Sequence, residues 1–149
     1  MRIDKLTTKF QEALSDAQSL ALGNDHAYID PLHLLAAMLR QNDGPKALLE
    51  RAGANVAAMS TAVENAVKQL PQVTGQDQVQ VGPDLAKLLQ ATEKEAIKRG
   101  DQFIASELFL LALADSDTKA AKIAKDNGLN RKAMEAAISL VRGGKTMDS

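Results

Sequence analysis

Three residues near the carboxyl end of the chain, Gly144-Lys145-Thr146, match the last positions of the phosphate-binding loop motif G-x-x-x-x-G-K-[ST]. Such a loop binds phosphate because it follows a strand and opens a helix, whose backbone N–H groups then point at the anion. Here the preceding segment has the apolar spacing of a helix, and Ser139 stands inside that helix where the motif requires its first glycine. We therefore expect Gly143 and Gly144 to end a helix, and we expect no nucleotide at this position.

The two histidines, His26 and His33, lie near Asp25 and Asp30 and are the other side chains that could do chemistry. A zinc ion needs three or four convergent ligands, whereas His26 lies in an expected loop and His33 in the first turn of an apolar helix. We interpret them as structural, with a half-buried or helix-capping role. The sequence also has no cysteine and no G-x-S-x-G motif, so nothing indicates a nucleophilic site. We expect no catalytic residue, no metal and no cofactor in this chain.

The composition suits a helical globular protein without a strongly charged partner. Of the 149 residues, 45% are hydrophobic and 3% aromatic, and Ala and Leu dominate, as suits closely packed helices. The 18 basic and 19 acidic residues give a net charge of −1, which favours neither nucleic acid nor an acidic membrane as partner. No apolar run approaches the roughly 18 residues of a membrane span, and MRIDKL is not typical of a signal peptide. We expect a cytoplasmic protein that is monomeric when isolated.

Apolar residues recur every three or four positions along almost the whole chain, which predicts helices. The first helix is expected after Thr8, with Gln11 completing a capping box, and Thr7 is the alternative N-cap. Asp30-Pro31 predicts the start of a second helix, because an acid caps the N-terminus and proline suits the first turn. Further helices are expected at 46–51, over 56–70 and from Pro83 onward.

The second half of the chain repeats the first. A shift of 75 residues needs no gap and places Gly53-Ala54-Asn55 on Gly128-Leu129-Asn130, and Tyr28-Ile29 on Phe103-Ile104. The matched positions are apolar helix faces, turn glycines and cap asparagines, which specify a backbone path. Each copy is too small to bury its own apolar faces well, so we expect the two copies to pack against each other about a pseudo-twofold axis.

This duplication defines the expected organisation of the chain. The fold class is all-α, with two four-helix repeats and about eight helices in one domain, residues 1–142. Repeat one covers about 6–70 and repeat two about 84–142. The polar segment 71–83 between them contains two Gly and two Pro and is interpreted as a linker or extended connection. Residues 143–149 are interpreted as the start of a flexible tether.

The repeated strings are recognisable. FQEALSDAQSLALGNDHAYIDPLHLLAAML and LAKLLQATEKEAIKRGDQFIASELFLLALA resemble the double Clp N-terminal repeat, which precedes the ATPase rings of Clp/Hsp100 unfoldases. The opening MRIDKLTTKFQEAL, the connection LPQVTG, the string KRGDQFIASELFLLAL and the terminal VRGG are similar to the ClpB-type disaggregase branch of this family. The resemblance covers essentially the whole chain.

The resemblance implies a function that the composition does not reveal. The whole protein would be a hexameric AAA+ machine that uses ATP to thread aggregated polypeptide through its pore, in collaboration with the DnaK chaperone system. This domain would sit on a tether above its own AAA+ ring, bind unfolded or aggregated polypeptide and help to pass it inward. ATP and Mg²⁺ would belong to ATPase modules that this chain lacks.

Polar site residues also follow from the resemblance. In ClpB-type domains, residues that match Thr7, Asp101 and Glu107 are implicated in chaperone function and substrate contact. Two of them also have a local explanation. Thr7 is a candidate N-cap, and Glu107 could complement a helix dipole next to Ser106 as an N-cap.

Unfolded chains display apolar segments, so a substrate site should contain exposed apolar side chains beside polar ones. The seam between the two copies offers Leu89 and Leu108 as substrate-binding candidates, which the apolar peptide groove of the family supports. Ala91 and Leu14 are further candidates there. Ordinary core packing is the competing interpretation of each of them.

Two other functions are compatible with the sequence. Related Clp N domains of protease-associated unfoldases bind small adaptor proteins instead of substrate, and adaptor docking is the alternative function. The domain could also act as a purely structural spacer, which predicts no interaction with unfolded protein.

Overall fold

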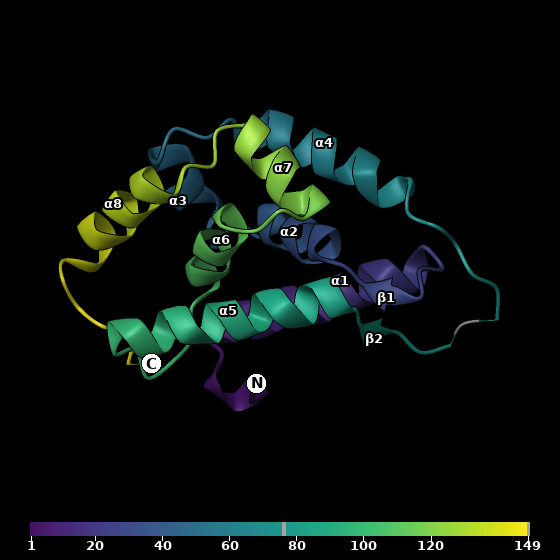
Figure 1. Cartoon of the computed structure of the whole chain (residues 1–149), viewed down its shortest axis with the longest axis horizontal. Coiled ribbons are helices and arrows are strands. Elements are labelled where there is room, and N and C mark those ends of the chain that lie inside the picture. The colour runs from purple at the N-terminus through teal and green to yellow at the C-terminus, as the bar shows by residue number, and fades with distance from the viewer. Residues whose placement is uncertain (76, 149) are drawn as a thin grey trace.

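The computed structural model describes residues 1–75 and 77–148, and within them the chain is largely helical (Figure 1). Repeat one contains α1 (Thr8–Gly23), α2 (Pro31–Arg40), α3 (Lys46–Arg51) and α4 (Val56–Lys68). Repeat two contains α5 (Pro83–Arg99), α6 (Ser106–Ala114), α7 (Lys119–Asp126) and α8 (Arg131–Arg142). A 3-10 helix, η1 (Ile3–Lys5), and the short strands β1 (Tyr28–Ile29) and β2 (Gln80–Val81) complete the described elements. The predicted all-α fold of about eight helices is confirmed.

Several helix starts follow from local capping chemistry. The Asp30 carboxylate accepts the backbone N–H of Leu32 at 2.9 Å and caps α2. Asn55 and Asn130, which correspond under the 75-residue shift, cap α4 and α8. Each side chain accepts a backbone N–H three residues further along, which satisfies a donor that the first turn of a helix leaves unpaired.

The predicted capping box at Thr8 is wrong. Thr7 is the N-cap of α1, and its hydroxyl accepts the N–H of Phe10 at 3.3 Å. The backbone at Thr7 is extended, as an N-cap requires, whereas Thr8 is already helical. The Gln11 side-chain amide donates to the Leu6 carbonyl at 3.0 Å, whereas a capping box would require this side chain to accept the Thr8 backbone N–H.

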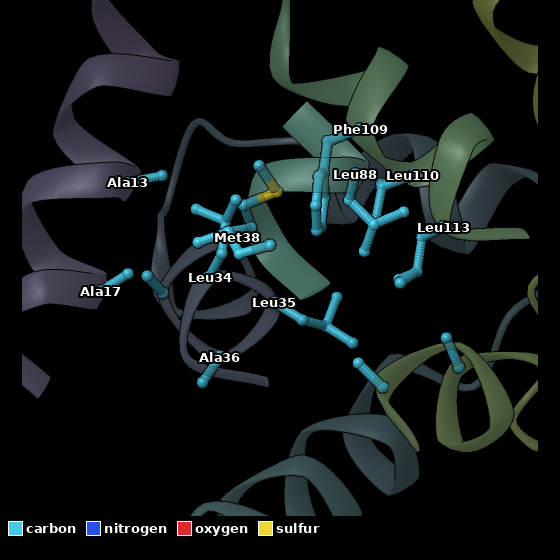
Figure 2. Packing of buried hydrophobic residues seen from close by; sticks show 14 of the residues in the cluster. Ala13, Ala17, Leu34, Leu35, Ala36, Met38, Leu88, Phe109, Leu110 and Leu113 are labelled. Carbon is cyan, nitrogen blue, oxygen red and sulfur yellow. The ribbon is translucent and has the colours of Figure 1, made fainter. Parts of the chain in front are cut away.

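The central helices α2 and α6 occupy corresponding positions in the two repeats. In α2 the residues from Pro31 to Leu39 are all buried, and α6 is similarly buried from Leu108 to Leu113. A helix that is apolar on every side must be enclosed by other helices. Figure 2 shows Leu34, Leu35 and Met38 of α2 close to side chains of α6, with small alanines of α1 on the other side of α2. Both repeats therefore contribute to one hydrophobic core.

Strand pairings follow the duplication and join the two repeats. Ile29 of β1 pairs with Val81 of β2 in parallel, and a second parallel bridge joins Leu6 to Ile104. The 75-residue shift relates the first pair to the second, with Ile29 matching Ile104 and Val81 matching Leu6. Each repeat thus pairs with the segment that precedes the first helix of the other. The segment 71–83 accordingly contains a paired strand, and its last residue, Pro83, already begins α5.

The chain reverses direction after α8. Gly143 is left-handed, with φ 59°, and Gly144 follows at φ 82°. Ser139 lies inside α8, so the element directly before the Gly-Lys-Thr string is a helix and not a strand. Residues 145–148 return toward the loop between α5 and α6, where the Met147 carbonyl accepts the N–H groups of Gln102 and Phe103. Flexibility of the segment 143–149 stays a prediction.

Candidate functional site

Two surface grooves flank the segment that precedes α1. The first, here called the apolar groove, has a volume of about 300 Å³. It is lined by Met1, Ile3, Leu6, Leu14, Val81, Ala86, Leu89 and Gln90. The second, here called the polar groove, has a volume of about 570 Å³ and includes Thr7, Lys9, Arg51, Ser106 and Glu107 in its lining. Consecutive residues, Leu6 and Thr7, therefore face different grooves.

The apolar groove lies between the first helices of the two repeats. Leu14 comes from α1 and Leu89 from α5, while Leu6 is held by the bridge to Ile104. In that bridge the Ile104 N–H donates to the Lys5 carbonyl at 2.7 Å, and the Thr7 N–H donates to the Ile104 carbonyl at 3.0 Å. The groove is therefore positioned by the pairing between repeats.

Its rim exposes apolar side chains to solvent. Ile3 is 64% exposed, Met1 45% and Val81 44%, whereas Leu89 retains only 9% exposure. Exposed apolar atoms around a hollow are the expected form of a site for an apolar ligand segment. The polar lining residue Gln90 supplies a polar edge.

The polar groove contains Thr7 and Glu107, two of the predicted site residues. Thr7 lies at the start of α1, and Glu107 lies in the first turn of α6. The prediction that Ser106 caps α6 is wrong. Ala105 holds the N-cap position without a side-chain hydrogen bond, and Ser106 is the first helical residue. Glu107 does lie in the first turn, where a negative charge complements the helix dipole.

Asp101 and Glu107 meet at one guanidinium, that of Arg142 at the end of α8. Arg142 donates from Nη1 to Asp101 Oδ2 at 2.8 Å and from Nη2 to Glu107 Oε2 at 3.1 Å. The Asp101 side chain has no exposed surface, and those of Arg142 and Glu107 are 10% and 15% exposed. Burial alone would lower the pKa of Arg142, but the hydrogen bonds and charges of the two acids outweigh it and raise that pKa.

Leu108 does not lie at the surface. Its side chain is completely buried in α6, so the expectation that it forms an exposed part of the site is wrong. The reason is that α6 is apolar on nearly all sides and is enclosed in the core. Of the two further candidates, Leu14 lines the apolar groove, whereas Ala91 is partly buried against the core and does not line it.

The two histidines form a buried hydrogen-bonded pair. His26 Nδ1 and His33 Nε2 are 2.9 Å apart, and His33 Nδ1 accepts the Asp30 N–H at 2.9 Å, which completes a capping box at α2. Because Nδ1 of His33 is an acceptor, the neutral ring carries its proton on Nε2 and donates it to His26. No cluster of three metal-binding side chains occurs among the described residues. Burial raises the pKa of the neighbouring Asp30 despite its hydrogen bond from Leu32.

Arg142 was not among the residues predicted for the site. The duplication nevertheless contained a signal, because the 75-residue shift places Arg142 on Val67, a buried position of α4. A charge at a position that is apolar in the other copy indicates a partner for that charge. Met1, Ile3 and Val81 were also missed, since they lie outside the helices whose spacing guided the prediction.

Among the described residues, no helix combines the length and apolar character needed to cross a membrane.

Comparisons with known proteins agree with this geometry. The family model described as "Clp repeat (R) N-terminal domain" matches residues 5–127. The chain is 44% identical over 152 residues to the chaperone protein ClpB of Pseudomonas putida, covering 99% of this chain and 18% of that protein. The chain thus spans about a fifth of the length of that curated relative.

Solved structures share the fold. The Hsp104 N-terminal domain from Candida albicans superposes with a TM-score of 0.84 at 23% identity, covering 97% of this chain and 96% of that one. A complex of the ClpV N-domain with a VipB peptide gives a TM-score of 0.76 at 22% identity, covering 99% and 92%. At these identities the likeness establishes the fold.

Proposed function

The chain belongs to the Clp repeat (R) N-terminal domain family, and from this premise we propose that its apolar groove binds apolar segments of unfolded or aggregated polypeptide. The observation that carries the proposal is the group of exposed apolar side chains that line a hollow at the seam of the two repeats. Met1, Ile3 and Val81 form its rim, and Leu89 lies deeper within it.

The size of the groove predicts weak binding. About 300 Å³ accommodates only a few side chains of an extended segment. A disordered chain loses conformational freedom when it binds, which offsets much of the gain from apolar contact. We expect a dissociation constant on the order of micromolar or weaker. Weak binding suits a site that must release its ligand.

In the whole protein, this binding would serve delivery to the ring. ATP hydrolysis and Mg²⁺ binding would belong to AAA+ modules outside this chain, so the domain itself would be a binding module and not an enzyme. Unfolded polypeptide would pass from the domain to its own AAA+ ring in the cytoplasm, with the DnaK system as an indirect partner. The similarity to chaperone protein ClpB supports this assignment.

Leu89→Glu is expected to reduce the affinity for unfolded polypeptide at least about tenfold, because it places a charge in the apolar groove. The measurement is an NMR titration of the isotope-labelled chain with a polypeptide that has been reduced and alkylated so that it cannot refold. In the unmodified chain, amide shifts should cluster at residues lining the apolar groove.

Two further variants make this result specific. Ile3→Glu changes a side chain that is 64% exposed, so it should weaken binding without risk to the fold. Ile97→Glu introduces the same charge on α5 at a side chain that is 71% exposed and outside the groove, so it should bind like the original chain. Unchanged affinity in both Leu89→Glu and Ile3→Glu would contradict the proposal.

Adaptor docking is the alternative function. The ClpV N-domain complex with a VipB peptide indicates that a domain of this fold can bind a defined peptide. If the unfolded polypeptide causes no shifts at high micromolar concentration while a folded adaptor does, the adaptor function replaces the one proposed. If neither ligand causes shifts, the spacer interpretation replaces the proposed function.

A further inference from the structure

The cluster of Asp101, Arg142 and Glu107 has a third contact that the groove does not explain. The second carboxylate oxygen of Asp101, Oδ1, accepts the backbone N–H of Met147 at 2.9 Å. The Met147 carbonyl in turn accepts the N–H groups of Gln102 at 2.9 Å and Phe103 at 3.0 Å. The carboxyl-terminal segment is therefore bound through its backbone to the loop between α5 and α6.

The fold itself does not require this charged cluster. Under the 75-residue shift, Asp101 corresponds to His26, Glu107 to Leu32 and Arg142 to Val67. These three residues of repeat one are all buried without any ion pair among them. The turn that ends the first helix has the same backbone hydrogen bond in both repeats. The His26 N–H donates to the Ala21 carbonyl, and the Asp101 N–H donates to the Ala96 carbonyl. In repeat one the chain after α4 also returns to the loop that follows the first helix, where the Val73 N–H donates to the Asp25 carbonyl at 2.8 Å, a contact between backbone groups. In repeat two the returning segment 145–148 donates instead to a buried carboxylate, that of Asp101, so the charges are tied to how this segment is bound.

The charge balance supports the same conclusion. One guanidinium faces two carboxylates in a largely buried place, so one negative charge is left over. Buried carboxylates need further donors to offset the loss of water. The N–H of Met147 is the additional donor to Asp101. Release of the segment would leave Asp101 Oδ1 without this partner.

We propose that Asp101, Arg142 and Glu107 form a latch that binds the segment 145–148 and fixes the direction in which the chain leaves the domain. Without the latch, the chain would depart from the end of α8 at Gly143. With it, the chain crosses to the loop between α5 and α6, and Met147 becomes part of the wall of the polar groove beside Thr7 and Glu107. Asp101 and Arg142 are thus positioning residues that act on the exit of the chain.

Hydrogen exchange at two amides tests the latch in the 149-residue chain. The amides of Gln102 and Phe103 donate to the Met147 carbonyl, so their protection reports docking of the segment. Met147→Pro removes the N–H that Asp101 accepts, and it should increase exchange at both amides at least about tenfold. Amides of α2 and α6 should keep their protection, because the core is unchanged. Equal exchange at Gln102 and Phe103 in the original and variant chains would overturn the proposal.

A pair of arginine variants tests the cluster itself. Arg142→Gln removes the charge that holds both acids and should release the segment with the same pattern of exchange. Arg131→Gln is the matched control, because Arg131 lies on the same helix and binds Glu95 and Asp115, each at 2.7 Å, away from the segment. Protection that survives Arg142→Gln, or is lost equally in Arg131→Gln, would contradict a latch. No substrate is involved, so the outcome is independent of the proposed function.

Discussion

Acidification from pH 7 to pH 4 is expected to lower the free energy of unfolding by about 3 kcal/mol through His33 alone. Burial, and secondarily the charge of His26, lower the pKa of His33 from 6.5 to about 4. The hydrogen bonds explain why the ring resists protonation. A proton on Nδ1 would confront the Asp30 N–H that this nitrogen accepts, and would break the capping box of α2.

The direction in which stability changes with pH follows from which state, folded or unfolded, binds the proton more readily. Between about pH 6.5 and pH 4 the unfolded chain protonates His33 while the folded chain does not, so stability falls as pH falls. The stabilisation is complete above about 6.5, and the loss levels off below about 4. Asp30 acts in the opposite direction, because its raised pKa means that the folded state protonates this carboxylate at a higher pH than the unfolded state does. Asp84 and Lys119 also act electrostatically on Asp30, and they oppose each other.

Urea unfolding followed by circular dichroism at several pH values measures this effect. His33→Gln is the informative variant, because glutamine at this position can accept the Asp30 N–H in a capping box but does not titrate. The variant should lose most of the decrease between pH 6.5 and 4. A parallel decrease in both chains would show that other groups cause it.

Helix starts were predictable where the chemistry is local. Asp30, Asn55 and Asn130 cap their helices through groups only a few residues away, so the sequence around each contains the needed information. The choice between Thr7 and Thr8 was harder, since two adjacent residues offer the same hydroxyl. Backbone conformation decides between them, and it depends on the Thr7 bond to Ile104 in the other repeat.

The site was predictable only in part, because exposure depends on packing. Leu89 lies on the amphipathic helix α5, where spacing distinguishes one face from another, and it does reach a groove. Leu108 lies on α6, whose residues are apolar on nearly every side, so spacing could not tell which of them, if any, meets solvent. Arg142, which joins Asp101 to Glu107, lies 41 residues after Asp101 and 35 residues after Glu107. The tertiary fold sets such contacts, although the mismatch of Arg142 with Val67 indicated one.

Gly128→Ala is expected to destabilise the domain by about 3 kcal/mol or more, whereas Gly53→Ala should cost only about 1 kcal/mol. The two glycines correspond under the 75-residue shift, and both have left-handed backbones, with φ 103° and 92°. A Cβ at Gly53 would meet nothing within 4 Å, but one at Gly128 would lie 2.9 Å from Ala54 Cα and 3.2 Å from the Gly53 carbonyl oxygen. The cost of a left-handed alanine is common to both variants, and the clash with backbone applies only at Gly128.

This difference tests how the two repeats meet. The two turns touch directly, since the Asn55 N–H donates to the Asn127 carbonyl at 2.9 Å. Backbone on both sides of the contact leaves no flexible side chain to move aside, so an added methyl group must separate the repeats. Because α3 packs on α8 and α4 on α7 around these turns, that separation would disturb helices of both halves. Thermal or urea unfolding of the two variants measures the difference between their free energies of unfolding. Equal destabilisation would mean that the turns do not press together in solution, and that the helices alone hold the repeats in register.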